Sequence, residues 1–291
     1  DIEGLSIGVL VFADGFDGAF PRYAARPMGI TDSTNSANLN NEHLVTFIGS
    51  LDINNDKTNN SAFALALYEA YLYFQGMVPY HPPSSSTKWD AGTITLGDLT
   101  TIVKGDGGAI TGSNYKELAA IGDCNVSNFV IFISNGPAGG NEASTAIAKL
   151  TEVGGNTNWI DINQNGKVDD SESNWADEFS RFLYGSSGIR VFTIDVAPSL
   201  LLSDVNNSSL LKSMARQSNG TYFNAGSAEL LSKSLKEVFN QIQIANSVFA
   251  SPSLPMSSNT RGMSLNQVYL GMFRPDKNPR WFGNLKLYQF G

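Results

Sequence analysis

Two unbroken apolar runs, each followed by a segment with a helical pattern, constrain the fold of this chain most strongly. Residues 128–134 (NFVIFIS) and 189–196 (IRVFTIDV) have the length and composition of buried strands. A similar run covers residues 4–12, and residues 221–224 predict a short last strand. Strands without polar alternation need cover on both faces, which parallel sheets receive from their crossover helices. We therefore expect an α/β protein with a largely parallel sheet and helices on both faces.

The remaining periodic segments predict helices, and the polar segments predict loops. Residues 61–75 (SAFALALYEAYLYFQ) are apolar on every face, so this helix should be mostly buried and its aromatic rings should belong to the core. Two stretches, 13–41 and 76–123, have the Gly-, Ser-, Asn- and Pro-rich composition of long surface loops. The further helices are expected at residues 142–153, 174–184, 208–217 and 227–244.

Residues 161–172 (DINQNGKVDDSE) match the calcium-binding loop of the EF-hand type at every position of its template. Such a loop places oxygen ligands at positions 1, 3, 5, 7, 9 and 12, and it needs glycine at position 6 for a sharp turn. Gly166 occupies the turn, and a hard cation such as Ca²⁺ prefers six to eight oxygens. The predicted ligands are Asp161, Asn163, Asn165, Lys167 through its carbonyl oxygen, Asp169 and Glu172.

Two features distinguish this loop from a sensor site. Asn163 and Asn165 stand where acids are frequent, so the lower ligand charge predicts the weak affinity of extracellular calcium modules. The residues ahead of the loop, 156–158, are not helical, whereas those after it are. We therefore expect an insertion that stabilises the body of the protein, with Val168 as the apolar residue that fixes the loop to it.

The composition favours an exported protein. Charged residues make up 16% of the chain, against about 25% in an average protein, so Asn, Ser, Thr and Gly must cover much of the surface. The net charge of −8 argues against nucleic acid as a partner, and no apolar run approaches the roughly 20 residues of a membrane span. Asp1 does not begin a signal peptide, so we expect a fragment or a processed chain. The single Cys124 suggests a disulfide partner outside these residues, or else a buried free thiol.

The pattern changes after residue 245. Residues 248–255, 267–273 and 285–290 alternate apolar and polar side chains, and no helix follows them. We therefore divide the chain into an α/β domain at 1–245, with the inserted loop at 161–172, and a β-rich segment at 246–291. That segment is expected to begin a further β-domain.

The order of motifs resembles that of a von Willebrand factor A domain. The resemblance rests on residues 67–70 (LYEA) in a helix, 129–136 (FVIFISNG) at a strand end and 191–196 (VFTIDV) in another strand. The tail, with 266–270 (NQVYL), 273–275 (FRP) and 280–288 (RWFGNLKLY), resembles the junction in PilY-type tip proteins of type IV pili, where the A domain leads into a C-terminal β-propeller. The resemblance covers nearly the whole chain.

The resemblance implies a non-enzymatic, calcium-binding adhesin or assembly factor at the pilus tip. Such a protein is exported through the periplasm to the cell surface, and its partners are minor pilins and a host or abiotic surface. A domains also carry a metal-dependent adhesion site built from three loops. Its Asp-x-Ser-x-Ser loop would follow a strand ahead of Asp1 and is absent from this sequence.

The other two loops of the adhesion site are present but altered. Where the family has Thr before the LYEA helix, this chain has Asn60 and Ser61. Where the family has Asp before Gly, it has Asn135 and Gly136. Neutral ligands bind a divalent ion weakly, so two alternatives stay open: a degenerate metal site at Ser61 and Asn135, or a metal-free face held by hydrogen bonds.

No motif in the sequence predicts an enzyme. There is no Gly-x-Ser-x-Gly and no P-loop, and neither His43 nor His81 has an acid or cysteine at metal-binding spacing. Residues 52–60 have Lys57 where a calcium loop needs glycine, so they predict a polar turn. Two alternative functions remain: a calcium-dependent extracellular enzyme with its active site in a missing C-terminal β-propeller, and a general secreted adhesion module.

Overall fold

The structure is a computed structural model of the whole chain. It describes residues 5–13, 18–29, 40–51, 61–82, 88–90, 92–96, 100–103, 108–116, 118, 127–139, 142–199, 206–246, 267–274 and 282–289. Cys124, Asn60 and the polar turn at 52–60 lie outside these ranges. Within the described residues, no helix is both long and apolar enough to span a membrane.

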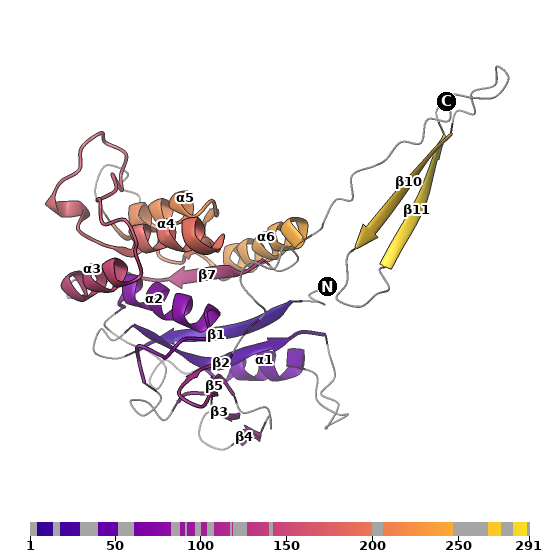
Figure 1. Ribbon diagram of the computed structural model, residues 1–291, viewed down its shortest axis with the longest axis horizontal. Coiled ribbons are helices and arrows are strands. Elements are labelled where there is room, and N and C mark those ends of the chain that lie inside the picture. The colour runs from indigo at the N-terminus through magenta and orange to yellow at the C-terminus, as the bar shows by residue number, and fades with distance from the viewer. Residues whose placement is uncertain are drawn as a thin grey trace.

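A parallel sheet of three strands forms the centre of the α/β body (Figure 1). The strands are β7 (Phe129–Ser134), β8 (Arg190–Asp195) and β9 (Tyr222–Asn224), in the order β7-β8-β9. Both pairs are parallel, and β7 and β8 are in register from Phe129 opposite Arg190 to Ser134 opposite Asp195. The apolar runs therefore form parallel strands, β8 mostly buried and β7 largely half-buried, and the predicted α/β class is confirmed.

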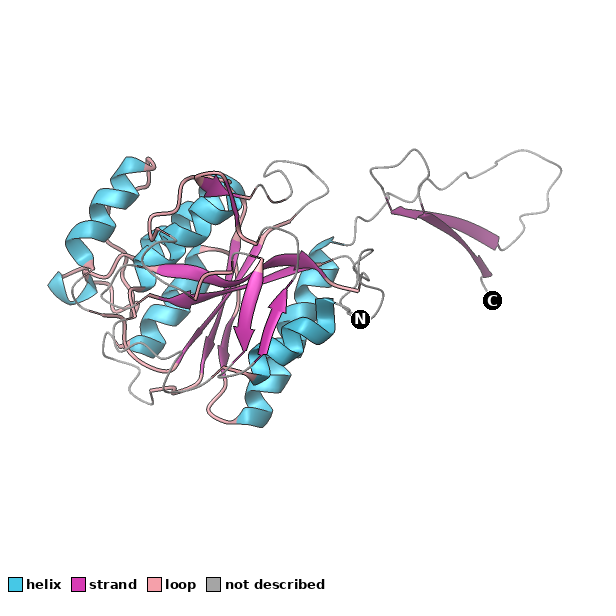
Figure 2. Ribbon diagram, turned by 90° about the horizontal axis from the view of Figure 1, so that it is seen from below, coloured by secondary structure: helices cyan, strands magenta, loops and turns pink. Residues whose placement is uncertain are grey.

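Helices cover both faces of this sheet, which Figure 2 shows as strands between helices. Successive side chains of a strand point to opposite faces. Val191 accordingly lies in the main core with α5 (Asn207–Gln217), while Phe192 packs against Val238 of α6 (Ala228–Asn246). This double cover explains why β8 carries apolar residues on both faces, whereas Ile133 of β7 is 44% exposed.

The helix rich in aromatic residues, α2 (Phe63–Phe74), is the most buried helix of the body. Ten of its twelve residues are buried, which confirms the expectation drawn from its all-round apolar sequence. Phe63 packs edge-on against Phe132 of β7, with ring centroids 4.8 Å apart. The helices α3 (Ala143–Glu152) and α4 (Ala176–Ser187) complete this layer.

One predicted loop, residues 13–41, is wrong because it contains a strand. β2 (Ala19–Pro27) pairs antiparallel with β1 (Ser6–Phe12) and is buried over most of its length. The helix α1 (Asn40–Gly49) follows and packs on this hairpin, with Phe47 and Tyr23 in ring contact at 5.6 Å. The sequence of β2 contains two prolines and two arginines, so it does not predict a strand. Contacts with residues distant in the chain stabilise it instead.

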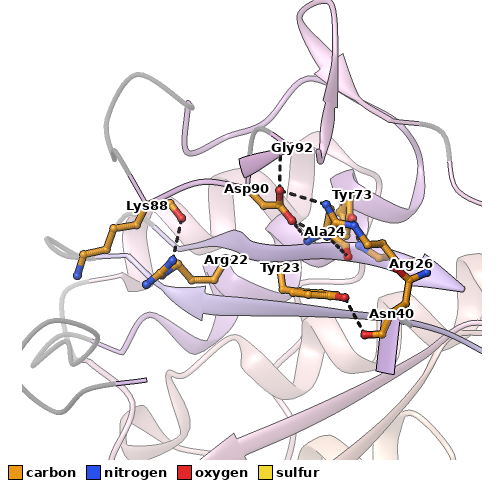
Figure 3. A network of polar contacts seen from close by, with 10 residues as sticks. Arg22, Tyr23, Ala24, Arg26, Asn40, Tyr73, Lys88, Asp90 and Gly92 are labelled. Atoms are coloured by element: carbon orange, nitrogen blue, oxygen red, sulfur yellow. Dashed lines mark hydrogen bonds and ion pairs between the residues drawn. The ribbon is translucent and has the colours of Figure 1, made fainter. Parts of the chain in front are cut away.

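A buried ion pair fixes the outer edge of β2 (Figure 3). Asp90 accepts hydrogen bonds from the Arg26 guanidinium at 2.6 and 3.2 Å and from the Ala24 amide at 2.7 Å. The Asp90 amide donates to the Pro21 carbonyl at 3.0 Å, and the Tyr73 hydroxyl accepts from the Ala25 amide at 2.7 Å. Side chains and a neighbouring segment therefore satisfy backbone groups at an edge that another strand could otherwise pair with.

The second predicted loop, residues 76–123, also contains short strands. Two small antiparallel hairpins lie in it, β3 (Thr93–Leu96) with β4 (Thr100–Val103) and β5 (Ile110–Thr111) with β6 (Asn114–Tyr115). Each strand has only two to four residues, too few for sequence periodicity to reveal.

Two strands from different sheets approach each other without pairing. Phe12, at the end of β1, contacts Phe132 of β7 with ring centroids 5.7 Å apart. Leu5, just ahead of β1, packs in the same cluster as Phe129 at the start of β7. The two strands therefore run in the same direction, but in the described part of the chain they belong to separate sheets.

The tail contains a hairpin of its own. β10 (Gln267–Arg274) pairs antiparallel with β11 (Phe282–Gln289) in unbroken register. The alternating segments at 267–273 and 285–290 therefore lie in strands, as predicted, and the further β-domain stays a prediction.

Candidate metal site

The loop 161–172 is folded by its own side-chain oxygens. Both carboxylate oxygens of Asp161 accept backbone hydrogen bonds, one from Asn165 at 3.0 Å and one from Gly166 at 2.7 Å. The side-chain oxygen of Asn163 accepts from the Asn165 amide at 3.1 Å, and that of Asn165 accepts from the Lys167 amide at 2.8 Å. Asp and Asn favour such turns, because their short side chains bond to backbone amides a few residues further on. Each of these oxygens keeps a second lone pair for another partner.

The turn residues have the conformation that the template requires. Gly166 has φ of 81°, a left-handed value that residues with a side chain rarely adopt. Gln164 is also left-handed, with φ of 59°. The loop then closes with a short 3-10 helix, Asp170–Glu172, in which the Glu172 amide donates to the Asp169 carbonyl at 3.0 Å.

Glu172, the predicted ligand at position 12, is a buried acidic residue. Its exposed fraction is 1%, and its Oε1 accepts a hydrogen bond from the Ile162 amide at 3.0 Å. The second oxygen, Oε2, is buried with no hydrogen-bond partner. A buried carboxylate oxygen without a partner is costly, and a bound cation is one way to satisfy it. This atom supports the donor set as a fit for a hard cation.

The apolar contact that fixes the loop comes from a different residue than expected. Val168 is 51% exposed, so the prediction that it pins the loop to the body is wrong. Ile162, at position 2, is 2% exposed and belongs to the main hydrophobic core. The loop is therefore fixed at its beginning by Ile162 and at its end by Glu172.

Acidic side chains alone do not make the site. Among the residues that the structure describes, no three His, Cys, Asp or Glu side chains form a group that could hold a metal ion. A cation in this loop would therefore also need the neutral oxygens of Asn163, Asn165 and the Lys167 carbonyl, as the template requires.

Residues outside the loop hold its first segment, and sequence analysis did not identify them. Arg216 of α5 donates to the Asp161 carbonyl at 3.0 Å and to the Ser213 hydroxyl at 3.0 Å. The Ser213 hydroxyl in turn donates to the carboxylate of Asp177 in α4 at 2.5 Å. Glu178 accepts from the Ile160 amide at 3.1 Å. Two helices therefore clamp the backbone immediately around the first predicted ligand.

Asp177 and Glu178 form a wholly buried carboxyl pair behind the loop. Burial raises the pKa of both side chains, and for Glu178 the neighbouring Asp177 charge raises the pKa further. Acidic side chains in the first turn of a helix normally lie in solvent and interact favourably with the helix dipole. Their burial could not be inferred from the sequence.

The structure brings together the two segments in which the resemblance predicts parts of an adhesion site. The Gly139 amide donates to the Ser61 carbonyl at 2.8 Å, which joins the segment after β7 to the segment before α2. Asn135 is exposed directly after β7, and the Ser134 hydroxyl donates to the Gly136 carbonyl at 2.8 Å. Backbone and hydroxyl hydrogen bonds therefore connect this face, which we call the Ser61 face, defined by Ser61 and Asn135.

Glu142 is a buried acidic residue beneath the Ser61 face. It is 2% exposed, and its carboxylate accepts from the backbone amides of Ala64 at 3.2 Å and Leu65 at 3.0 Å. These amides belong to the first turn of α2, where a helix has unsatisfied donors and a partial positive charge. Burial nevertheless raises the pKa of Glu142 to about 7.

Glu69 makes the structure sensitive to pH, because its carboxyl is fully buried in α2. It accepts from the Tyr80 and His81 amides and from the Tyr115 hydroxyl, and burial raises its pKa from 4.5 to about 7. The folded state therefore binds this proton more tightly than the unfolded chain, and the free energy of unfolding falls as the pH rises from 4.5 towards 7. His81 itself is buried and stacks with Phe20 and Trp89.

The Glu69→Gln variant is expected to lose this part of the pH dependence. Urea unfolding from about pH 4.5 to about pH 8 should show the wild type losing about 3 kcal/mol more stability than the variant, because 1.36 kcal/mol corresponds to one pKa unit. The Glu229→Gln variant, which changes an exposed residue of α6, is the control. It should lose as much stability between these pH values as the wild type does. Parallel pH profiles of wild type and Glu69→Gln would contradict the assignment.

Comparison of the chain with protein-family models, with curated proteins and with solved structures gave no match.

Proposed function

We propose that this chain is a non-enzymatic, calcium-binding A-type domain of a type IV pilus tip protein, with roles in adhesion and pilus assembly. The observation that carries the calcium part is the loop 161–172, which pairs a complete ligand template with the buried, unpartnered Oε2 of Glu172. The resemblance of residues 280–288 to the PilY-type junction carries the pilus part. The same resemblance places the protein at the cell surface, with minor pilins as its partners.

The ligands of the ion would be Asp161, Asn163, Asn165, the Lys167 carbonyl, Asp169 and Glu172. When bound, Ca²⁺ supplies charge neutralisation and a fixed geometry for the loop. The chain's own residues provide the frame, since Ile162 lies in the core and Arg216 holds the Asp161 carbonyl. A loop held on both sides by packed elements suits a stabilising ion better than a conformational switch.

The arrangement of β1 and β7 supports the A-type fold. These strands run in the same direction and contact each other through Phe12 and Phe132, although they are not paired. One additional strand between them would complete a single sheet with the order β2-β1-x-β7-β8-β9, where x is the added strand. By the resemblance, Asp-x-Ser-x-Ser follows a strand ahead of Asp1, and we propose that this strand takes the place x.

The pilus role is tested by locating the protein and its partners. Pili sheared from cells that carry this protein should contain it in the pilus fraction, and tagged protein should capture minor pilins from that fraction. A secreted protein found only in the medium, without minor pilins, would favour the general adhesion module. Turnover of an added quinone-dependent substrate by the full-length protein would favour the enzyme with a β-propeller active site.

A further inference from the structure

The loop 161–172 places an asparagine directly before a glycine, at Asn165 and Gly166. In such a pair the backbone nitrogen of the glycine can attack the side-chain carbonyl of the asparagine, because no Cβ on the glycine shields it. Both residues are exposed, and a Cβ at Gly166 would meet no atom within 4 Å. The reacting groups and water therefore have open access to this position.

The loop holds a base and a hydrogen-bond donor against these two residues. The Gly166 amide donates to the Asp161 carboxylate at 2.7 Å, so a base is in place to accept its proton. The Asn165 side-chain oxygen accepts from the Lys167 amide at 2.8 Å. A donor at this oxygen stabilises the negative charge that develops there when the carbonyl carbon is attacked. The ring that this hydrogen bond closes includes the Gly166 nitrogen, so nucleophile and carbonyl lie side by side.

We propose that Asn165 is a site of spontaneous deamidation, promoted by Asp161 and the Lys167 amide and suppressed by a cation in the loop. The Gly166 nitrogen forms a bond to Cγ of Asn165, and the bond from Cγ to Nδ2 breaks. The proton that Asp161 accepts from Gly166 leaves with Nδ2 as ammonia. Water then opens the succinimide ring and leaves aspartate or isoaspartate at position 165, without an oxidant or a reductant.

Suppression by a cation rests on the proposed calcium site, whereas the deamidation itself does not. Asp161 and Asn165 are both predicted ligands, so the same oxygens serve either the ion or the reaction. Coordination would engage the carboxylate that acts as the base. It would also hold the Asn165 oxygen at the ion, whereas the attack requires the side chain to turn onto the Gly166 nitrogen. The loop should therefore react when it is empty of calcium.

The two products change the calcium loop in opposite ways. Aspartate adds a charged ligand at position 5, and ligand charge is one of the factors that set the affinity of such loops. Isoaspartate lengthens the backbone between positions 5 and 6, so the ligands on the two sides of the turn no longer converge. Exposure of the protein without calcium would thus alter its own binding site permanently.

The reaction is measured by mass spectrometry of proteolytic peptides after incubation of the chain at neutral pH, with a chelator or with saturating Ca²⁺. With the chelator, Asn165 should deamidate at least about tenfold faster than Asn135, less than the full effect of a positioned base in an enzyme. Asn135 is the matched control, because it is exposed and precedes Gly136. The Gly136 amide donates to the Ser134 hydroxyl at 3.3 Å, a far weaker base than a carboxylate. Saturating Ca²⁺ should remove the difference between the two sites.

Two variants test the part played by Asp161. Asp161→Asn keeps the size of the side chain but removes the base, so Asn165 should react about as slowly as Asn135 even with the chelator. Asp170→Asn changes an exposed acid of the same loop and should leave the rate at Asn165 unchanged.

The outcomes separate the deamidation from the calcium site. Equal rates at Asn165 and Asn135 in the wild type, or an unchanged rate in Asp161→Asn, would overturn the proposal. Fast deamidation that Ca²⁺ does not slow, in samples that bind Ca²⁺ by calorimetry, would overturn the suppression alone. Fast deamidation in a chain that gives no calcium-binding heat would overturn the calcium site and support the self-modification.

Discussion

Asp90→Asn is expected to destabilise the protein by about 3–5 kcal/mol, the cost of leaving one member of a buried ion pair without its partner. Asp90 and Arg26 are 1% and 3% exposed, and their closest atoms lie 2.6 Å apart. The change removes the charge that neutralises Arg26 and weakens the acceptor of the Ala24 amide. Because these bonds fix β2, the hairpin that it forms with β1 should loosen first. Urea unfolding at pH 7 measures the loss.

The chain provides a matched control for this prediction. Lys149 and Glu152 form an ion pair of similar length, 2.7 Å, but the Glu152 side chain is 58% exposed. Exposed pairs contribute roughly 0–1 kcal/mol, so Glu152→Gln should be nearly neutral. Similar losses for Asp90→Asn and Glu152→Gln would contradict the role that we assign to burial.

Gly220→Ala should be the most disruptive change of a single methyl group. A Cβ at Gly220 would lie 2.1 Å from the carbonyl oxygen of Val191 and 2.7 Å from its carbonyl carbon. Both atoms belong to the backbone of β8, which cannot move without disturbing the central sheet. Overpacking of this kind costs about 3 kcal/mol, which for a chain of this size lowers the Tm by roughly 5 °C.

Gly185→Ala is the corresponding control. This glycine lies inside α4, and a Cβ there would meet nothing within 4 Å. Replacing a helical glycine by alanine stabilises a protein by about 0.5–1 kcal/mol, so the Tm should rise slightly. Thermal unfolding followed by circular dichroism distinguishes the two variants. Equal effects of the two changes would show that β9 does not approach β8 as closely as described.

Local patterns predicted the parts of the fold that depend on local forces. The runs that became β7 and β8, and the apolar segment that became α2, carry their burial in their own sequence. β2 was missed because its strand depends on Asp90, 64 residues from Arg26, and on the Tyr73 hydroxyl. The pattern of apolar residues within 19–27 cannot predict contacts with residues so distant in the chain.

The sequence also predicted only the local part of the candidate site. The twelve-residue spacing predicted the ligands, and the turn at Gly166 has the conformation that the spacing requires. Val168 was assigned the wrong role because the template does not state which apolar residue faces this particular body. Arg216 and Glu178 hold the beginning of the loop from two other helices, a tertiary arrangement that spacing along the chain does not encode.

A calorimetric calcium titration tests the central claim most directly. The wild type should bind one Ca²⁺ with a Kd of about 10⁻⁴–10⁻³ M, as expected for a loop with two neutral ligands in place of acids. Asp170→Asn changes a loop acid that is not a predicted ligand and should bind as the wild type does. Asp161→Ala combined with Glu172→Ala should give no binding heat. An unchanged titration of that double variant, or none in the wild type, would contradict the account.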